Sequence, residues 1–336
     1  MTCLFEPSIT IVLPTYNSAR TLKLCLKSIH DQNYPKEKMK VVIVDGGSLD
    51  DTLKICKHFG VYKIVKNPLV AEEAGKPIAI KMADTDLILF IDSDNVLSTS
   101  EWISKMVQPF VDEQIVATEP LYYHYRRSDG LLTRYVSLLG ADDALDPYIG
   151  GYDRFCYLRN KWAEQPMTVE DKGEYLKIVL NSQSLPPMGA NGYMVRRQAM
   201  NQIIYYPLHI HTDTIYRLVK SGYNCMAKVK IGIVHLHSNN VTTFIRKKIR
   251  RIQKYYLWKK HREYYPPRNT AGLQNFFLQA IFLLPIVMDV MRAYKRIPDR
   301  AWLFHIPACY LTLLAYSVGI FPYLTSRFVR KILGTT

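Results

Sequence analysis

Two aspartates, separated by one residue, follow an apolar run in the segment FIDSDN at residues 90–95. In an extended chain residues i and i+2 point to the same side, so the carboxylates of Asp92 and Asp94 converge if the strand persists to Asp94. Two neighbouring carboxylates repel each other when nothing lies between them. Proteins usually place them together where they bind a divalent cation or share a proton. The alternative is a solvated turn, because Ser, Asp and Asn commonly follow a strand. The motif is therefore a candidate site.

The segments before this motif alternate between strand-like and helix-like patterns. Short apolar runs, separated by segments of helical spacing, cover residues 9–13, 41–44, 61–65 and 86–89. Strands that alternate with helices predict an α/β fold, with a mainly parallel sheet and helices on both faces. Ligands bind such sheets at the carboxyl ends of the strands. Thr15, Asp45, Asp92 and Asp94 all follow a predicted strand end, which favours a functional role for the carboxylate pair.

Positive charge is concentrated in the last part of the chain. The 336-residue sequence has a net charge of +15, and residues 241–336 contain 17 Lys and Arg against 3 Asp and Glu. A nearly neutral body, with a net charge of +1, therefore continues into a basic and apolar tail. This asymmetry indicates a polyanionic partner, either nucleic acid or an anionic lipid surface. The apolar content of 48% argues against overall disorder.

The cysteines and the N-terminal residues indicate the cellular compartment in which the protein folds. The six cysteines are scattered without a C-x-x-C pair, so we expect neither a disulfide framework nor a zinc site. This usage fits a reducing compartment. Residues 1–10 lack a basic segment followed by an apolar one, so we expect that no signal sequence exports the body.

Five motifs in a fixed order resemble those of family 2 glycosyltransferases. They are PTYNSARTL at 14–22, VVIVDGGSLDDT at 41–52, FIDSDN at 90–95, GANGYMVRR at 189–197 and HTDT at 211–214. The resemblance implies the GT-A fold, a Rossmann-like sheet that binds a nucleotide-diphosphate sugar. We expect a glycosyltransferase domain at 1–240, with a nucleotide-sugar-binding half at 1–118 and an acceptor half at 119–240. Residues 119–190 lack a sustained period and form either substrate-facing loops or a structural insertion.

The resemblance assigns the donor site to small, polar and acidic residues near the strand ends. The implied nucleotide-sugar-binding residues are Pro14, Thr15, Tyr16, Asp45, Lys76, Asp92, Ser93, Asp94, Gly189, Ala190, Asn191 and Gly192. Thr15 and Asp45 suit the nucleobase and ribose, with Asp45 accepting a base N–H, and Asp92 would contact the ribose. Lys76 would either reach a phosphate or remain solvated. The turn at 189–192 would line the sugar pocket, where a side chain would obstruct close approach, or it is a plain turn.

A divalent cation is the implied reason that the two carboxylates coexist. Asp94, together with Asp92, would bind Mn²⁺ or Mg²⁺, which bridges the two phosphates and neutralises charge on the departing diphosphate. The segment IGIVHLHS places His235 and His237 on one face of a strand, and many metal-dependent relatives supply a histidine there. Imidazole is a better ligand for Mn²⁺ than for Mg²⁺. We favour His235 as the ligand, and the alternative is that both histidines are structural.

Asp213 is the predicted general base. In an inverting transfer it would take the proton of the acceptor hydroxyl while the oxygen attacks the anomeric carbon. The family often carries a second acidic residue before this position, where the chain has Thr212. Asp213 is alternatively a first-turn acid that favours the helix dipole, and no base is needed if the acceptor is a phosphate. The Q-x-x-R-W motif of processive synthases is absent after Gln253, which favours transfer of a single sugar.

Residues 244–265 have the pattern of a basic amphipathic helix. Helical spacing collects four apolar side chains on one face, namely Ile245, Ile249, Ile252 and Tyr256. Lys and Arg between them, with Tyr and Trp at the edges, suit an anionic membrane interface, and nucleic acid is the competing partner. We therefore expect a basic interfacial helix within residues 241–270.

Two apolar stretches follow this helix and argue against nucleic acid as the partner. They cover residues 273–291 and 301–325, and each approaches the length of a membrane span. The first stretch contains Asp289, each stretch contains proline, and the connection between them is basic. A basic connection on the far side would conflict with the positive-inside tendency. We therefore expect a re-entrant or interfacial helical hairpin at 271–336, and a true two-span hairpin is the alternative.

These features together predict a metal-dependent, inverting glycosyltransferase at the cell membrane, with its catalytic domain on the cytoplasmic side. Its donor would be a UDP or GDP sugar, and its acceptor a lipid-linked sugar or polyprenyl phosphate. One alternative is a haloacid-dehalogenase-like phosphatase, in which Asp92 is the nucleophile and Asp94 the acid/base. Its motif would end the first strand, whereas about 85 residues precede it here. The other alternative is a catalytically inactive membrane scaffold.

Overall fold

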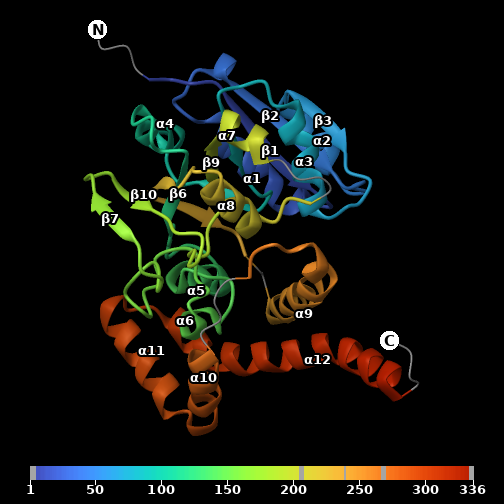
Figure 1. The fold of residues 1–336 in the computed structure, drawn as a ribbon, viewed down its shortest axis with the longest axis vertical. Coiled ribbons are helices and arrows are strands. Elements are labelled where there is room, and N and C mark those ends of the chain that lie inside the picture. Colours follow the sequence, from blue (N-terminus) through green and yellow to red (C-terminus); the bar gives the residue numbers. More distant parts are fainter. Residues whose placement is uncertain (1–4, 204–207, 238–239, 266–269, 333–336) are drawn as a thin grey trace. The chain divides into compact units, whose positions relative to one another are not determined.

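The computed structural model describes residues 5–203, 208–237, 240–265 and 270–332. The chain divides into two compact units (Figure 1). The sheet unit extends to Tyr125 and also includes Ala163–Leu236, and the helical unit comprises Arg126–Trp162 and the chain from His237 onward. The helical unit thus combines a segment from the middle of the sequence with the C-terminal helices. The domain boundaries expected from the sequence, at residues 118, 240 and 270, stay predictions.

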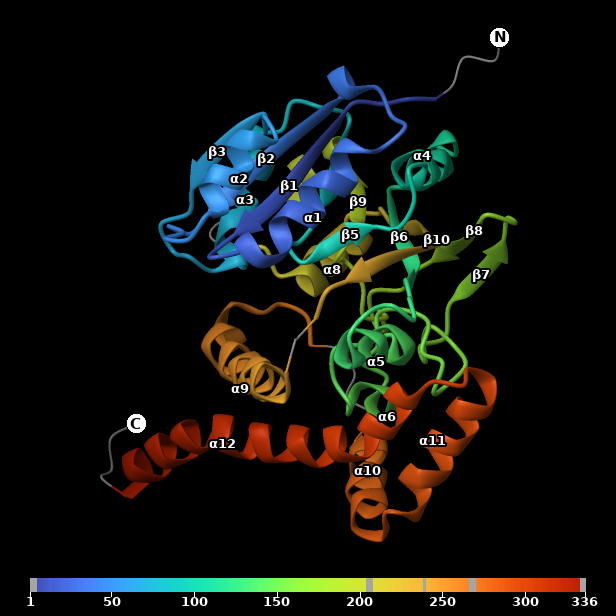
Figure 2. The same cartoon turned by 180° about the vertical axis from the view of Figure 1, so that it is seen from behind.

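One sheet of ten strands organises the described residues of the sheet unit. The strands are β1 Ile9–Thr15, β2 Met39–Asp45, β3 Lys63–Lys66, β4 Leu87–Phe90, β5 Asn95–Leu97, β6 Ala117–Tyr123, β7 Thr168–Asp171, β8 Tyr175–Val179, β9 Tyr193–Arg196 and β10 Cys225–His235. Their order in the sheet is β3-β2-β1-β4-β9-β6-β10-β8-β7, and β5 pairs with β10. Strands β3, β2 and β1 can be followed as neighbours in Figure 2.

The first four strands form the parallel part of the sheet that the sequence predicts. Strand β1 pairs in parallel with β2 and β4, and β2 pairs in parallel with β3. The helices between them are α1 Ala19–His30, α2 Thr52–His58 and α3 Glu72–Met82. Alternate residues of β1 share a core with α1, and α3 covers the opposite face, where Gly75 lies against Val44. The predicted α/β fold with helices on both faces is confirmed.

Beyond β4 the sheet is mixed, which the sequence does not reveal. Strand β9 pairs antiparallel with both β4 and β6, whereas β6 and β10 are parallel. Strands β7 and β8 form an antiparallel pair that continues the sheet from β10. The described part of this unit also contains α4 Trp102–Val107, α7 Arg197–Ile203 and α8 His211–Lys220. The insertion of β9 beside β4 brings the turn before β9 to the carboxyl end of β4.

The helical unit contains α5 Leu131–Leu139, α6 Asp146–Ile149, α9 Val241–Trp258, α10 Thr270–Phe282, α11 Leu284–Arg296 and α12 His305–Ile332. The apolar stretch at 273–291 is not one continuous helix, because α10 and α11 meet at Leu283 with a bend of 98° (Figure 1). Pro285 lies in the first turn of α11, where a proline is tolerated, whereas it would break a helix that continued through it. The two helices form an apolar elbow.

The apolar face of α9 does not lie free for lipid. It packs against α12, where Gly319 contacts Ile249 and Ile252 so closely that a side chain at this position would clash. The rings of Tyr256 and Tyr323 stack at a centroid distance of 4.8 Å in the same contact. These contacts with α12 cover part of the face, and the interfacial role expected for residues 241–270 stays a prediction. Helical periodicity identified the apolar face, but another helix covers part of it.

Helix α12 buries two polar side chains among small apolar ones and exposes several large apolar residues. His305 is fully buried between the hydroxyls of Tyr135 and Tyr148, at 2.8 and 2.9 Å, and Thr312 is also fully buried. Its exposed apolar residues include Tyr310, Leu314, Val318 and Phe321. Residues Arg300–Tyr323 are long and apolar enough to cross a membrane, and the bent α10–α11 pair would be a second crossing if it formed one span.

Candidate active site

A hydrogen-bonded turn follows β2, and its first residue, Asp45, is also bonded to the end of β1. Thr15 and Asp45 are directly paired in register, and the Thr15 hydroxyl donates to the Asp45 carboxylate at 2.9 Å. The same carboxylate accepts the Gly47 N–H and the N–H and hydroxyl of Ser48. Burial raises the pKa of Asp45, but these hydrogen bonds outweigh burial and leave the pKa below its ordinary value. Asp45 is therefore an ionised residue that organises the turn.

The proposed contact of Asp45 with a nucleobase stays a prediction. Both of its oxygens already accept two hydrogen bonds each, which is about the capacity of a carboxylate. A base N–H would have to replace one of these donors. Tyr16, which follows β1, is half exposed, and Val70 packs against Gly46 with a φ of 62°. Such a φ is unusual for a β-branched residue, and sequence reasoning offers no signal for this loop.

Asp92 and Asp94 lie in a tight turn and not on one strand face. Strand β4 ends at Phe90, so strand alternation does not continue to the aspartates. Asn95 closes the turn, because its side chain accepts the Asp92 N–H at 3.0 Å and its own N–H donates to the Asp92 carbonyl at 2.9 Å. Ser93 donates to the Ser18 hydroxyl at 2.9 Å. The turn gives each carboxylate a different neighbour.

The neighbour of Asp92 is Lys76, which projects from α3. The Lys76 ammonium lies 3.5 Å from an Asp92 oxygen, and the lysine is buried, not solvated. Burial raises the pKa of Asp92 to about 6 although Lys76 opposes the shift. Burial also lowers the pKa of Lys76, but Asp92, Glu72 and Glu73 outweigh burial and hold it above its usual value. The site therefore contains a fixed positive charge beside the carboxylate pair.

The neighbour of Asp94 is His235, the last residue of β10. Its Nε2 lies 3.4 Å from an Asp94 oxygen, and the next residue, Leu236, donates its N–H to the Asp94 carbonyl at 2.8 Å. The His235 ring also contacts Tyr123, at a centroid distance of 5.4 Å. His237 instead packs its ring against Phe244, at 6.0 Å. Of the two candidate histidines, the structure brings His235 to the carboxylate turn.

A divalent cation fits the Asp94 and His235 pair only as part of a larger ligand set. Within the described ranges, no three His, Cys, Asp or Glu side chains lie close enough to hold an ion by themselves. A carboxylate oxygen and an imidazole nitrogen are nevertheless suitable donors for Mn²⁺. The remaining positions would have to come from a ligand that brings its own oxygens, and a diphosphate is such a ligand.

The turn at 189–192 is buried between the end of β4 and the first turn of α8. The Gly192 N–H donates to the Phe90 carbonyl at 2.8 Å, and Asn191 donates to the Tyr123 hydroxyl at 3.3 Å. Gly189 has a φ of 97°, and a Cβ there would lie 3.2 Å from the His211 Cβ. A glycine is therefore required both by conformation and by close packing. The turn is an internal feature of the site and not a solvated surface turn.

Asp213 lies in the first turn of α8 and is only 2% exposed. The preceding His209 stacks on Phe90 at 4.9 Å and lies 3.3 Å from the Thr214 hydroxyl. Burial lowers the pKa of His209 well below its ordinary value, so this imidazole is neutral. These contacts attach α8 to β4. A buried carboxylate differs from the solvated first-turn acid of the alternative interpretation, although its role as the base stays a prediction.

Comparison with known families matches residues 10–135 to the family model described as Glycosyl transferase family 2. This part of the chain belongs to glycosyl transferase family 2. The family 2 domain includes the β1 and β2 turn, Lys76, and the carboxylate turn at 92–95. The resemblance read from the motifs in this part of the chain is therefore confirmed. The comparisons give no support to the phosphatase or the inactive scaffold.

Curated relatives match the family 2 domain over a limited part of their own length. A poly(ribitol-phosphate) beta-N-acetylglucosaminyltransferase, TarS, of Staphylococcus aureus is 31% identical over 109 residues, which is 31% of this chain and 19% of the relative. The glycosyltransferase GlyA of Streptococcus pneumoniae is 26% identical over 214 residues, which is 60% of this chain and 28% of the relative. The matches thus span less than a third of either relative.

A solved structure shares the fold of nearly the whole chain. It is a mannosyltransferase, PcManGT, of Pyrobaculum calidifontis, with 16% sequence identity and a TM-score of 0.52, and the match covers 97% of this chain and 81% of that one. At this identity the likeness shows the fold alone. The GT-A fold expected from the motifs is therefore confirmed.

The family 2 domain and the segments after it also contain residues that sequence reasoning missed. Asn95 closes the carboxylate turn, Tyr123 bonds to Asn191 and contacts the His235 ring, and Glu119 holds the turn at 189–192. Asn95 belongs to the quoted motif FIDSDN, so its position was a signal, whereas Tyr123 and Glu119 lie in the region without a readable period. Long-range pairing of β6, β9 and β10 places these residues, and no local pattern reports it.

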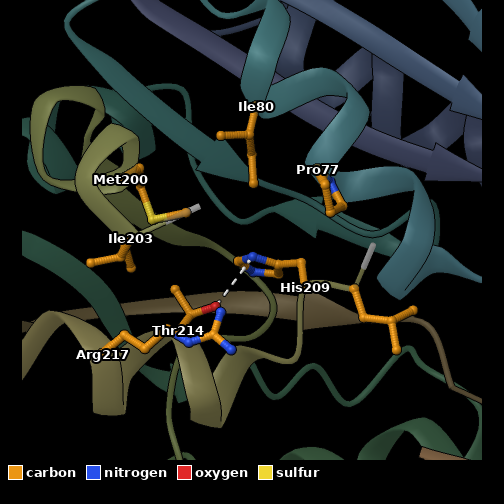
Figure 3. Close-up of a pocket in the computed structure, with 8 residues that line it drawn as sticks. Pro77, Ile80, Met200, Ile203, His209, Thr214 and Arg217 are labelled. Atoms are coloured by element: carbon orange, nitrogen blue, oxygen red, sulfur yellow. Dashed lines mark hydrogen bonds between the residues drawn. The ribbon is translucent and has the colours of Figure 1, made fainter. Parts of the chain in front are cut away.

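The cavity drawn in Figure 3 is too small to be a substrate site. It lies among α3, α7 and α8 and measures about 10 Å³, which is the lower limit for one water molecule. Its lining residues are Pro77, Ile80, Met200, Ile203, Leu208, His209, Thr214 and Arg217. Figure 3 shows the His209 and Thr214 contact on its wall. The cavity belongs to the packing of α8 against α3 and α7.

Proposed function

We propose that this protein is a metal-dependent, inverting glycosyltransferase that moves one sugar from a UDP or GDP sugar to a membrane-associated acceptor. The observation that carries the proposal is the gathering of Lys76, Asp92, Asp94 and His235 at the carboxyl end of β4. Lys76, Asp92 and Asp94 lie within the part of the chain that matches family 2. The mannosyltransferase that shares the fold was solved with GDP-Man and Mn²⁺. That donor and metal class agree with the side chains gathered here.

In this proposal the described residues bind the two ends of the donor. Asp94 and His235 would hold Mn²⁺ or Mg²⁺, which when bound neutralises the negative charge that the diphosphate carries as it departs. Lys76 adds a positive charge next to Asp92, and Asp92 contacts the ribose. Pro14, Thr15, Tyr16, Asp45 and Ser93 border the nucleoside, and Gly189–Gly192 borders the sugar. Gly189 and Gly192 pack closely against protein atoms, which fixes the turn in its position beside the sugar.

The acceptor is activated by Asp213 in this proposal. Its carboxylate takes the proton of the acceptor hydroxyl, the acceptor oxygen forms a bond to the anomeric carbon, and the bond from that carbon to the diphosphate breaks. This single displacement inverts the anomeric configuration. If the acceptor is a polyprenyl phosphate, its oxygen is already ionised and Asp213 is not needed as a base. The effect of removing Asp213 therefore distinguishes the two acceptor classes.

We further propose that the helical unit attaches the enzyme to the cell membrane, with the catalytic residues on the cytoplasmic side. The supporting observation is an exposed apolar surface, the elbow surface, which consists of Phe277, Leu278, Ile281, Phe282, Leu283 and Leu284. Six exposed large apolar residues within eight positions are more than a water-exposed helix junction normally contains. The exposed face of α12 is apolar as well. An acceptor that is linked to a lipid fits an enzyme held at a bilayer.

The reaction is tested by supplying UDP and GDP sugars to detergent-solubilised protein with Mn²⁺ and an extract of membrane lipids. We expect release of one nucleoside diphosphate, and a lipid product whose anomeric configuration, read by NMR, is opposite to that of the donor. Thr212→Val is the matched control for changes near Asp213, because Thr212 precedes it on α8. A product with retained configuration, or release of inorganic phosphate from a phosphate ester, would contradict the proposal.

A further inference from the structure

Glu119 of β6 and Lys228 of β10 form an ion pair in the interior of the sheet unit. Both residues are 0% exposed, and the Lys228 ammonium lies 2.6 Å from one Glu119 oxygen. The two residues are direct partners in the parallel pairing of β6 and β10. The pair is therefore fixed by the sheet itself and does not depend on a mobile surface side chain.

The second Glu119 oxygen holds the turn at 189–192. It accepts the N–H groups of Gly189 and Ala190, at 2.9 and 3.2 Å. These residues precede β9, more than 60 positions away in the sequence, so the contact joins three separate segments of the sheet unit. Carboxylates that accept backbone N–H groups make stronger hydrogen bonds than neutral acceptors do. Glu119 thus connects the turn to the central strands.

An ion pair in this place has no advantage for stability alone. Removing two charges from water costs several kcal/mol, and well-packed apolar residues of similar volume are often equally stabilising. Apolar residues would, however, leave the N–H groups of Gly189 and Ala190 without this acceptor. The carboxylate is therefore suited to fixing two adjacent N–H groups, and Lys228 supplies the counter-charge beside it.

We propose that Glu119 is a positioning residue for the donor sugar, and that Lys228 supports it. This inference rests on the proposed function, since the turn at 189–192 borders the sugar only if a sugar nucleotide binds there. Glu119 fixes the first half of the turn, and the Gly192 N–H to the Phe90 carbonyl fixes the second half. Because Gly189 also packs on His211, a displaced turn would press on α8, which carries Asp213.

The test compares the affinity for a sugar nucleotide with the affinity for the free nucleoside diphosphate. In Glu119→Gln, the amide oxygen can face the turn only if the amide N–H groups face Lys228, and two donors then oppose each other. We expect the affinity for the sugar nucleotide to fall about tenfold or more, because hydrogen bonds to a charged group are lost. The affinity for free UDP or GDP should be unchanged, because the nucleotide binds at the ends of β1 and β2.

Two further variants separate positioning from stability. In the double variant Glu119→Gln with Lys228→Gln, the two introduced amides can bond to each other while the amide oxygen on β6 accepts the turn N–H groups, so most of the lost affinity should return. Thr118→Val is the matched control, because Thr118 is the fully buried neighbour on β6 and donates to the Met106 carbonyl at 3.0 Å. It should lower the unfolding midpoint without changing the ratio of the two affinities.

The possible results are distinct. A fall in the affinity for the sugar nucleotide alone, with rescue in the double variant, supports the role of Glu119. An equal fall for both ligands, or a similar fall in Thr118→Val, overturns it and leaves the proposed function intact. If the wild-type protein binds neither UDP, GDP nor their sugars, the proposed function itself fails and this inference fails with it. If Glu119→Gln does not fold, Lys228→Gln takes its place, with a smaller loss expected for the sugar nucleotide only.

Discussion

The sheet unit and the helical unit both bury polar side chains, but they surround them differently. In the sheet unit, polar groups such as Asp45, Asp213 and the Glu119–Lys228 pair lie at strand ends or beside the turn at 189–192, within an otherwise apolar core. In the helical unit, His305 bonds to two tyrosines inside the unit. The exposed elbow surface of that unit is apolar.

This difference shows which surroundings each unit suits. Asp45, Asp213 and the Glu119–Lys228 pair are buried near the candidate site, where ligand binding would offset the cost of burying them. On α12, the buried His305 contacts two tyrosines and several large apolar side chains face outward, whereas the outer face of a helix on a water-soluble protein is usually polar. An exposed apolar surface of this kind is stable next to lipid. The comparison therefore agrees with the proposal that the sheet unit carries the chemistry and the helical unit the attachment.

The first prediction has the largest expected effect. It concerns a substitution that removes sugar transfer and leaves membrane attachment unchanged. Asp213→Asn keeps the shape of the side chain but cannot accept a proton, so we expect transfer to a hydroxyl acceptor to fall by roughly 10²–10⁴-fold. Donor affinity and vesicle binding should not change. Rates of nucleoside diphosphate release, measured beside calorimetric donor affinities, test this separation. An unchanged rate would show that Asp213 is not the base, as expected for a phosphate acceptor.

The second prediction compares two neighbouring phenylalanines of α10. Phe276 is fully buried, whereas Phe277 is 48% exposed. Phe276→Ala should lower the free energy of unfolding by about 3–5 kcal/mol, because it leaves a cavity. Phe277→Ala should have little effect on unfolding in detergent. Denaturant titrations of both variants provide the measurement, and equal losses would show that the elbow surface is covered inside the protein.

The third prediction concerns lipid binding by the elbow surface. Ile281 is 74% exposed, and moving such a side chain from water into lipid contributes about 1.5–3 kcal/mol. Ile281→Asp should therefore weaken binding to anionic vesicles by roughly 10–100-fold in a flotation assay. The matched control is Leu49→Asp in the sheet unit, where Leu49 is 92% exposed. If both variants bound vesicles equally well, the proposed difference in lipid binding between the two units would be refuted.

The fourth prediction concerns the pH dependence of stability that the buried imidazole of His209 causes. The pKa of His209 is lowered in the folded protein, so the unfolded state binds more protons below about pH 6.5 and stability falls as the pH decreases. Between pH 6.5 and 5 this group should cost up to about 2 kcal/mol. His209→Gln should remove that part of the loss. Hydrogen exchange of β4 and β9 at both pH values measures it, and an identical loss in the variant would refute the assignment.

The sequence predicted the parts of the fold that depend on local pattern. Strands β1 to β4 and the helices between them follow from apolar periodicity, and the motif order located Asp45, Asp92 and Asp94 at the strand ends. The mixed pairing of β6, β9 and β10 was not predictable, because it joins segments more than 60 residues apart. Glu119 and Tyr123 were missed for the same reason.

The C-terminal helices show a second limit of sequence reasoning. Periodicity in α9 correctly located an apolar face, but it could not tell whether lipid or protein covers that face. Contact with Gly319 of α12 answers this question for the Ile252 side chain. Likewise, composition described residues 273–291 as one apolar stretch, whereas Pro285 at the start of α11 divides it. Composition predicts the preferred surroundings of a segment but not its partner.

The most direct test of the account is the binding of nucleotides at the carboxylate turn. Calorimetric titration of the detergent-solubilised protein with UDP and with GDP, with and without Mn²⁺, should show metal-dependent binding of one of them. Asp94→Asn should abolish the metal dependence, and Asp51→Asn, a surface change 67% exposed in its side chain, should not. Binding of neither nucleotide by folded protein, or binding that depends on neither Mn²⁺ nor Asp94, would contradict the account.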